Sequence, residues 1–220
     1  ERMSEVARRI GARVIRVEAE PGTALDAGEM ADAIRRAKPA VVAFVHAETS
    51  TGVLQPVEEI ATAARESEAM LVLDCVTSLG GIPVSLDEWG VDAAYSGTQK
   101  CLSCPPGLSP VSFSERAVSR VSERETPVQS WYFDISLLAG YYGGERIYHH
   151  TAPISAIYAL AEGLEIIEEE GMEARAARHR RAAAALIDAL TPLGFEPLVA
   201  EEHRLPSLTT LRLPEAILRE

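Results

Sequence analysis

Several polar and ionisable residues lie at the ends of three segments that the sequence predicts to be strands. These residues are Glu48, Thr49, Asp74, Gln99 and Lys100. A lysine amine held near a pocket loses its proton more easily and can attack a carbonyl, forming a Schiff base. A carboxylate at a set distance can stabilise a protonated heterocyclic nitrogen by its opposite charge. Asp74 and Lys100 therefore supply the two groups that pyridoxal phosphate requires of a protein.

Asp74 and Lys100 lie 26 positions apart, a separation that can place them on neighbouring strand ends facing one crevice. A charge at the end of a buried strand is costly without a partner, so a purely structural ion pair between them stays open as an alternative. A solvated lysine is a second alternative. A cofactor phosphate would also need donors. The segment "ETSTG" at 48–52 offers hydroxyls and backbone N–H groups, and Gln99 offers an amide.

These residues must be positioned by strands that alternate with helices. Apolar or β-branched runs predict strands at 12–20, 40–46, 69–76, 91–97, 108–114 and 207–214. Helical spacing or capping predicts helices at 26–38, 56–67 and 114–124. The run at 40–46 is continuously apolar, as expected of a strand that is buried on both faces of a parallel sheet. We therefore expect an open, mainly parallel α/β sheet, which binds ligands beyond the carboxyl ends of its strands.

The second half of the chain has a different pattern. Two long helices are predicted at 155–170 and 172–190, and Gly171 between them is a typical helix stop. We expect a large cofactor-binding domain over 1–170, with its N-terminal part missing. The beginning of a smaller C-terminal domain is expected over 171–220.

Composition excludes some classes of function. The 220 residues carry a formal net charge of −12, which argues against a nucleic-acid binder, since that needs clustered positive charge. No apolar run reaches the roughly 18 residues of a membrane span, and no signal peptide is visible. Three cysteines, Cys75, Cys101 and Cys104, do not resemble a disulfide framework, which favours a cytoplasmic location. A peroxisomal or mitochondrial location stays open.

Neither the cysteines nor the histidines predict a metal site. Cys101 and Cys104 form C-x-x-C, but no second C-x-x-C or nearby histidine pair completes a zinc site. The prolines that follow do not open a helix, as a thioredoxin-like redox pair needs. His149 and His150 are adjacent, so on an extended segment they point in opposite directions, and we expect at least one of them to be packed.

Four segments, in order and at plausible spacing, resemble the class V aminotransferases, and more closely their alanine–glyoxylate and serine–pyruvate aminotransferase branch. These segments are "HAETSTGVLQP", "LVLDCVTSLGGIPVSLDEWGVDAAYSGTQK", "PPGLSPVSFS" and "YHHTAPISAIYAL". The similarity extends from about residue 10 to the end of the chain. It implies fold type I of the pyridoxal-phosphate-dependent transferases, with a mainly parallel large domain and a smaller α+β C-terminal domain.

The resemblance also implies roles for individual residues. Lys100 would form the Schiff base with pyridoxal 5′-phosphate, and Asp74 would pair with the pyridinium nitrogen. Thr49, where the family often has serine, would bond the cofactor near its ring hydroxyl. Gln99 would reach the phosphate. Once the substrate displaces it, the Lys100 amine could act as the general base and acid of the 1,3-proton shift.

Through Tyr148 and Thr151, the resemblance also implies a homodimer with shared active sites. In the family, residues at the positions of Tyr148 and Thr151 contact the phosphate of the cofactor in the other subunit. Because the chain starts at Glu1 rather than Met, we also expect it to be a fragment. The family's glycine-rich phosphate turn and ring-stacking aromatic residue would precede it. The arginine that binds the substrate carboxylate would follow Glu220.

The reaction that the resemblance implies is transamination between a small amino acid, alanine or serine, and glyoxylate or pyruvate. An alternative is another class V small-amine transaminase, such as the aminoethylphosphonate–pyruvate type. A cysteine desulfurase is disfavoured, because its reactive cysteine follows the lysine at a distance and no cysteine here follows Cys104. A non-catalytic α/β module, with Asp74 and Lys100 in structural roles, is an alternative from another class.

Overall fold

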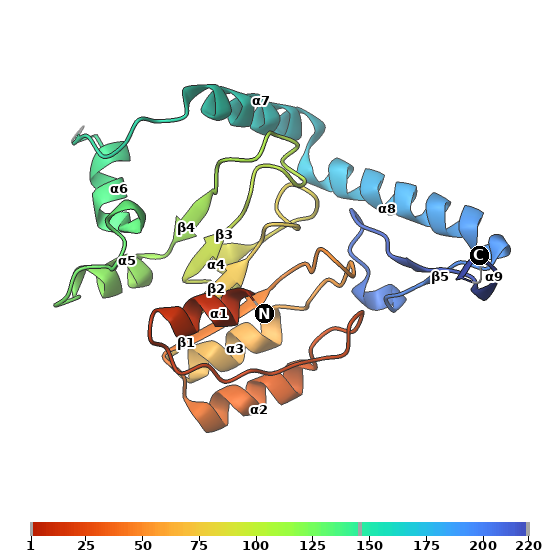
Figure 1. The fold of residues 1–220 in the computed structure, drawn as a ribbon, viewed down its shortest axis with the longest axis horizontal. Coiled ribbons are helices and arrows are strands. Elements are labelled where there is room, and N and C mark those ends of the chain that lie inside the picture. Colours follow the sequence, from red (N-terminus) through yellow and green to blue (C-terminus); the bar gives the residue numbers. More distant parts are fainter. Residues whose placement is uncertain (1, 145–146, 219–220) are drawn as a thin grey trace.

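The computed structural model describes residues 2–144 and 147–218, and its centre is a four-stranded sheet (Figure 1). The strands, in their order across the sheet, are β1 (Val41–Val45), β2 (Met70–Asp74), β3 (Ala93–Tyr95) and β4 (Val111–Phe113). The first three are parallel, and β4 is antiparallel to β3. The mainly parallel α/β sheet predicted from the sequence is therefore confirmed, although each strand is shorter than its apolar run.

One face of this sheet is covered by helices and forms the main core. These helices are α2 (Ala27–Ala37), α3 (Glu58–Glu66) and α4 (Leu86–Trp89). Ile60 of α3 packs in the same core as Leu71 and Leu73 of β2, and all three are fully buried. Each such side chain contributes about 1.5–3 kcal/mol when it leaves water. Packing of this size fixes the strands, and with them the loops that follow.

The opposite face of the sheet is open among the described residues. Val41 of β1 is 53% exposed and Val111 of β4 is 56% exposed. The expectation that the run at 40–46 is buried on both faces is thus wrong for the described chain. A continuous apolar run indicates only that both faces of the strand can be buried. Whether they are buried depends on the elements that pack against each face. Asp74 and Tyr95, paired in register, project toward this open face, since their neighbours Leu73 and Ala94 face the core.

Three other segments compare differently with what the sequence predicts. The strand predicted at 12–20 is wrong, because that segment pairs with no described strand. Its β-branched side chains suit a strand, but a strand also needs a hydrogen-bonded neighbour. Helix α1 (Arg2–Arg9) was not predicted. Helix α5 (Glu115–Ser122) is confirmed with its cap, since the hydroxyl of Ser114 accepts a hydrogen bond from Ala117 N at 3.1 Å.

The C-terminal half contains the two long helices that the sequence predicts, α7 (Ile154–Glu170) and α8 (Met172–Leu190). Gly171 separates them with φ 77°, a backbone conformation that favours glycine. In Figure 1, α7 runs above the sheet and α8 continues away from it toward the C-terminus. None of the described helices is both long and apolar enough to span a membrane.

Smaller elements complete the described chain. They are η1 (Trp131–Phe133), α6 (Ile135–Tyr142), η2 (Thr191–Leu193), β5 (Glu196–Pro197), η3 (Glu201–His203), β6 (Leu211–Arg212) and α9 (Glu215–Leu218). The strand predicted at 207–214 shrinks to β6, which pairs antiparallel with β5. This C-terminal region also bonds to the loop after β1, where Leu205 N donates to Gly52 O at 2.8 Å. Contacts therefore cross Gly171, and the domain division there stays a prediction.

Candidate active site

The loops that follow β1, β2 and β3 lie at one edge of the sheet. Val45, Asp74 and Tyr95 are neighbours in register across the three strands, so the strands end together. The loops are also joined by side chains, because the hydroxyls of Thr49 and Thr77 lie 2.5 Å apart. The polar residues that the sequence placed at strand ends therefore lie in loops at the same edge of the sheet.

Asp74 is held in place by two donors. Tyr95 Oη donates to Asp74 Oδ2 at 2.7 Å, and Val76 N donates to Oδ1 at 2.9 Å. Burial raises the pKa of Tyr95, and the hydrogen bond to Asp74 raises it further, so the phenol stays a donor at neutral pH. A carboxylate has acceptor sites left after these two bonds. The Asp74 carboxyl group is therefore held in one orientation and can still accept a bond from a ligand.

Lys100 lies in a tight turn after β3. Ser103 N donates to Lys100 O at 2.9 Å, and Cys104 N donates to Thr98 O at 3.0 Å, which closes the turn. Thr98 Oγ1 also donates to Pro105 O at 2.6 Å. The half-buried Lys100 side chain makes no hydrogen bond or ion pair with any described residue. The structural ion pair with Asp74 is thus not formed, and the amine is available to a ligand.

The other residues predicted for the site differ in their surroundings. Glu48 bonds within its own loop, accepting from the amides and hydroxyls of Ser50 and Thr51. Burial opposes its charge, but these hydrogen bonds outweigh that effect and lower its pKa. Gln99 is exposed, and its Oε1 would lie 2.8 Å from a Cβ on Gly97. Glycine at that position leaves room for the amide of Gln99.

Tyr148 and Thr151 lie away from these loops in sequence and make no described contact with Asp74 or Lys100. They belong to the segment between α6 and α7, where residues 147–153 form neither helix nor strand and residues 145–146 lie outside the described part. Tyr148 is 72% exposed, and its hydroxyl lies 3.2 Å from Thr151 Oγ1. Both residues are therefore exposed in this chain, with their hydroxyls near each other.

Two of the histidines, His46 and His149, are buried and packed. His46 is buried with its Nδ1 2.9 Å from Ser78 Oγ, and burial lowers its pKa to about 4, so it is neutral at pH 7. His149 is buried and stacks on Trp131, which confirms that at least one of the adjacent pair is packed. The described cysteines are all free, and the described residues contain no cluster of three or more metal-ligating side chains.

The cytoplasmic location that the sequence favours stays a prediction.

Sequence reasoning missed Tyr95 and Thr77, although both contact predicted site residues. Tyr95 reaches Asp74 only because β2 and β3 are neighbours in one register. Thr77 reaches Thr49 across 28 positions of sequence. The only signal available from the sequence was that each residue belongs to a strand end or the loop after it.

The sequence matches the family model "Aminotransferase class-V" over residues 2–217. It is 41% identical to alanine–glyoxylate aminotransferase of Rattus norvegicus, over 97% of this chain and 52% of that protein. It is 36% identical to (S)-ureidoglycine–glyoxylate transaminase of Bacillus subtilis, over 98% of this chain and 56% of that protein. The crystal structure of alanine–glyoxylate aminotransferase from Nostoc sp. matches with a TM-score of 0.94 and 43% identity, over 99% of this chain and 59% of that chain. The chain thus spans about half the length of the relatives it matches.

Proposed function

Because this chain belongs to the class V aminotransferase family, we propose that the whole protein is a pyridoxal-phosphate-dependent transaminase. It moves an amino group from a small amino acid, such as alanine or serine, to glyoxylate or pyruvate. The fold expected from the sequence, fold type I of these enzymes, is confirmed by the structural match to the Nostoc aminotransferase. The observation that carries the proposed reaction is the Lys100 amine, which has no partner among the described residues and lies in the turn after β3, the neighbour of the strand that ends in Asp74.

The donors and acceptors at this edge of the sheet fit pyridoxal phosphate. Lys100 Nζ would bond the aldehyde carbon, and the Asp74 carboxylate, oriented by Tyr95, would hold the proton on the ring nitrogen. Thr49 and Gln99 would supply hydrogen bonds to the ring hydroxyl and the phosphate. When bound, the cofactor supplies an electron sink for the pair released at the substrate Cα. Lys100, displaced by the substrate amine, would take the Cα proton as general base and give it back as general acid in the 1,3-proton shift.

The substrate class rests on the relatives, two of which carry glyoxylate in their names. The test is a panel of donors, namely alanine, serine, (S)-ureidoglycine and 2-aminoethylphosphonate, each with glyoxylate or pyruvate. We expect the fastest turnover with glyoxylate and alanine or serine, measured as glycine formed. Turnover with 2-aminoethylphosphonate and pyruvate alone would instead favour the alternative transaminase. A protein that binds no cofactor and converts no donor would favour the non-catalytic module.

We further propose that the working unit is a homodimer in which Tyr148 and Thr151 bind the phosphate of the partner's cofactor. Their exposure supports this role, since among the described residues neither side chain bonds to the Lys100 loop. A structural alternative is that Tyr148 packs at the interface and touches no cofactor.

Mixed dimers separate these cases. A Tyr148→Phe subunit is combined with a Lys100→Ala subunit, so the only site with a lysine receives its partner's tyrosine intact. We expect wild-type cofactor affinity at that site, and affinity weaker by about 1–3 kcal/mol, the range for one hydrogen bond to a charged group, in the Tyr148→Phe homodimer. Weakened binding in the mixed dimer would refute the role in trans. Unchanged binding in the homodimer would remove Tyr148 from the site.

A further inference from the structure

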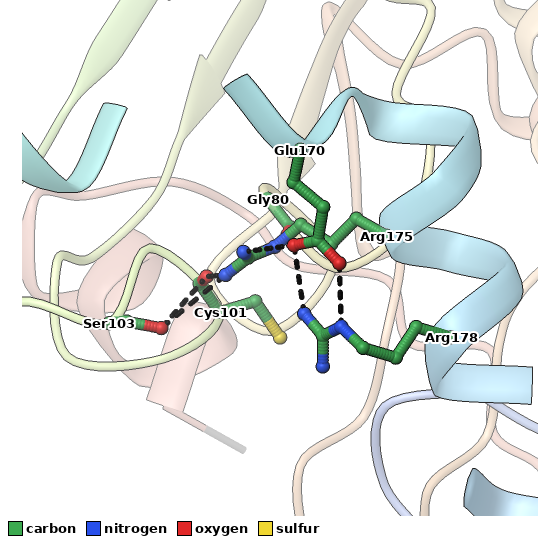
Figure 2. A network of polar contacts seen from close by, with 6 residues as sticks. All are labelled: Gly80, Cys101, Ser103, Glu170, Arg175 and Arg178. Atoms are coloured by element: carbon green, nitrogen blue, oxygen red, sulfur yellow. Dashed lines mark hydrogen bonds and ion pairs between the residues drawn. The ribbon is translucent and has the colours of Figure 1, made fainter. Parts of the chain in front are cut away.

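Arg175, in the first turn of α8, is a buried cation that is only 6% exposed. Figure 2 shows its guanidinium directed toward the segments that carry Gly80 and Cys101. Its Nε donates to Gly80 O at 2.7 Å, and its Nη2 donates to Cys101 O at 2.9 Å. A buried charge is costly unless it is fully bonded. The burial of Arg175 therefore indicates that its hydrogen bonds to these two carbonyls have a specific role.

The two carbonyls belong to the loops that carry the site. Gly80 lies in the loop after Asp74, and Cys101 directly follows Lys100. The loops touch each other closely, because a Cβ on Gly80 would lie 2.9 Å from Leu102 Cδ2 and 3.2 Å from the Cys101 carbonyl carbon. The guanidinium of Arg175 thus joins the loop that follows Asp74 to the loop that contains Lys100.

Arg175 is itself oriented by Glu170 and Arg178. Glu170 Oε2 accepts from Arg175 Nη1 at 2.8 Å, and both oxygens of Glu170 accept from Arg178, at 2.5 Å and 2.9 Å (Figure 2). Hydrogen bonds from Arg178, and then from Arg175, lower the pKa of Glu170 to about 2. The Glu170 carboxylate is ionised at neutral pH, so it offsets the positive charge of Arg175. Its hydrogen bond also helps to fix the orientation of the planar Arg175 guanidinium.

Besides the Arg175 bond, a weak thiol bond joins this turn to the loop after Asp74, from Cys101 Sγ to Thr77 O at 3.5 Å. Ser103 N bonds Lys100 O within the turn, and Ser103 adopts φ 60°, which few side chains favour. Cys104 Sγ contacts Ala159 O of α7 at 3.2 Å. Loss of the Arg175 bond would leave the Cys101 carbonyl without its buried donor, next to the lysine.

We propose that Arg175 is a positioning residue that holds the Lys100 amine at its working place through the Cys101 carbonyl. This inference rests on the proposed function of Lys100. Misplacement of a reacting group by about 1 Å can reduce a rate about 100-fold, so a contact one residue away from the amine matters. Arg175 touches neither substrate nor cofactor in this role.

The test uses Arg175→Met and Arg175→Lys, with Arg181→Met as the matched control. Arg181 lies on the same helix, is exposed and has no described partner. Each protein is freed of cofactor and treated with limiting acetic anhydride across a pH series, and acylation of Lys100 is measured by peptide mapping. Lys38, the other lysine of these 220 residues, is exposed and serves as the internal standard.

We expect the ratio of Lys100 to Lys38 acylation, and its pH midpoint, to change in Arg175→Met and to change less in Arg175→Lys. Arg181→Met should match the unmodified protein. In the cofactor-loaded protein, kcat should fall about tenfold to 100-fold in Arg175→Met with a small change in KM, as expected when a reacting group is displaced. Circular dichroism checks that each variant is folded.

An unchanged ratio and pH midpoint in a folded Arg175→Met would overturn the proposal, whatever happens to its thermal stability. If Arg175→Met does not fold, Arg175→Lys and Glu170→Gln decide in its place, because each should shift the ratio in the same direction. An unchanged ratio in both would also overturn it. Because acylation is read without cofactor, it tests Arg175 even if the unmodified protein fails to bind pyridoxal phosphate, a result that would refute only the transaminase function.

Discussion

Lys100→Ala is expected to eliminate covalent attachment of pyridoxal phosphate and to lower transamination by at least about 10⁴-fold, the upper range for one general acid–base group. The variant loses both the nucleophile for the aldehyde and the base for the Cα proton. Its fold should survive, because the Lys100 side chain has no hydrogen bond or ion pair among the described residues. Single-turnover rates, cofactor absorbance and thermal unfolding measure the three effects.

Lys38→Ala is the matched control, because Lys38 is the only other lysine in these 220 residues. It is an exposed residue at the C-terminal end of α2. We expect it to keep cofactor content and turnover close to those of the unmodified protein. Equal losses in the two variants, or a Lys100→Ala variant with near-normal turnover, would refute the assignment of Lys100.

Asp74→Asn is expected to reduce turnover by about 10²–10³-fold, which is about 3–4 kcal/mol of transition-state stabilisation and the scale of losing one preorganised electrostatic group. Asparagine has the shape of aspartate, and its one oxygen can accept from Val76 N while its amide nitrogen donates to the Tyr95 oxygen, so the loops should keep their positions. The main loss is then the negative charge opposite the ring nitrogen. The measurement is kcat at saturating cofactor and substrate.

Tyr95→Phe provides the comparison for Asp74. It removes the 2.7 Å hydrogen bond to the carboxylate but keeps the charge, so the loss should be smaller, on the order of 1 kcal/mol. Near-normal turnover of Asp74→Asn with full cofactor content would show that Asp74 does not act on the ring nitrogen. A larger loss in Tyr95→Phe than in Asp74→Asn would mean that the hydroxyl, rather than the carboxylate charge, matters most.

The sequence was sufficient to expect Asp74 and Lys100 at one edge of the sheet, because the carboxyl ends of parallel strands meet at one edge and both residues follow predicted strands of that kind. It was insufficient for contacts that depend on pairing. Tyr95 meets Asp74 only through the register of two strands, and the segment 12–20 lacked the neighbour that its side chains suggested. Pairing between strands that are far apart in the sequence leaves no local pattern of residues from which it could be predicted.

Arg175 illustrates the same point for helices. It lies in "MEARAARHRR", a charged stretch typical of a solvent-exposed helix face. The structure buries it because its acceptors, Gly80 and Cys101, come from loops 95 and 74 positions earlier. Spacing within the helix cannot distinguish this arginine from its exposed neighbours Arg178 and Arg181.

The identity of the lysine that binds the cofactor tests the transaminase function most directly. The whole protein is loaded with pyridoxal phosphate, reduced with borohydride to make the attachment permanent, digested and mapped by mass spectrometry. We expect the cofactor on the peptide that contains Lys100 and on no other. Attachment at Lys38 or at any other lysine, or cofactor bound without any lysine attachment, would contradict the proposed site.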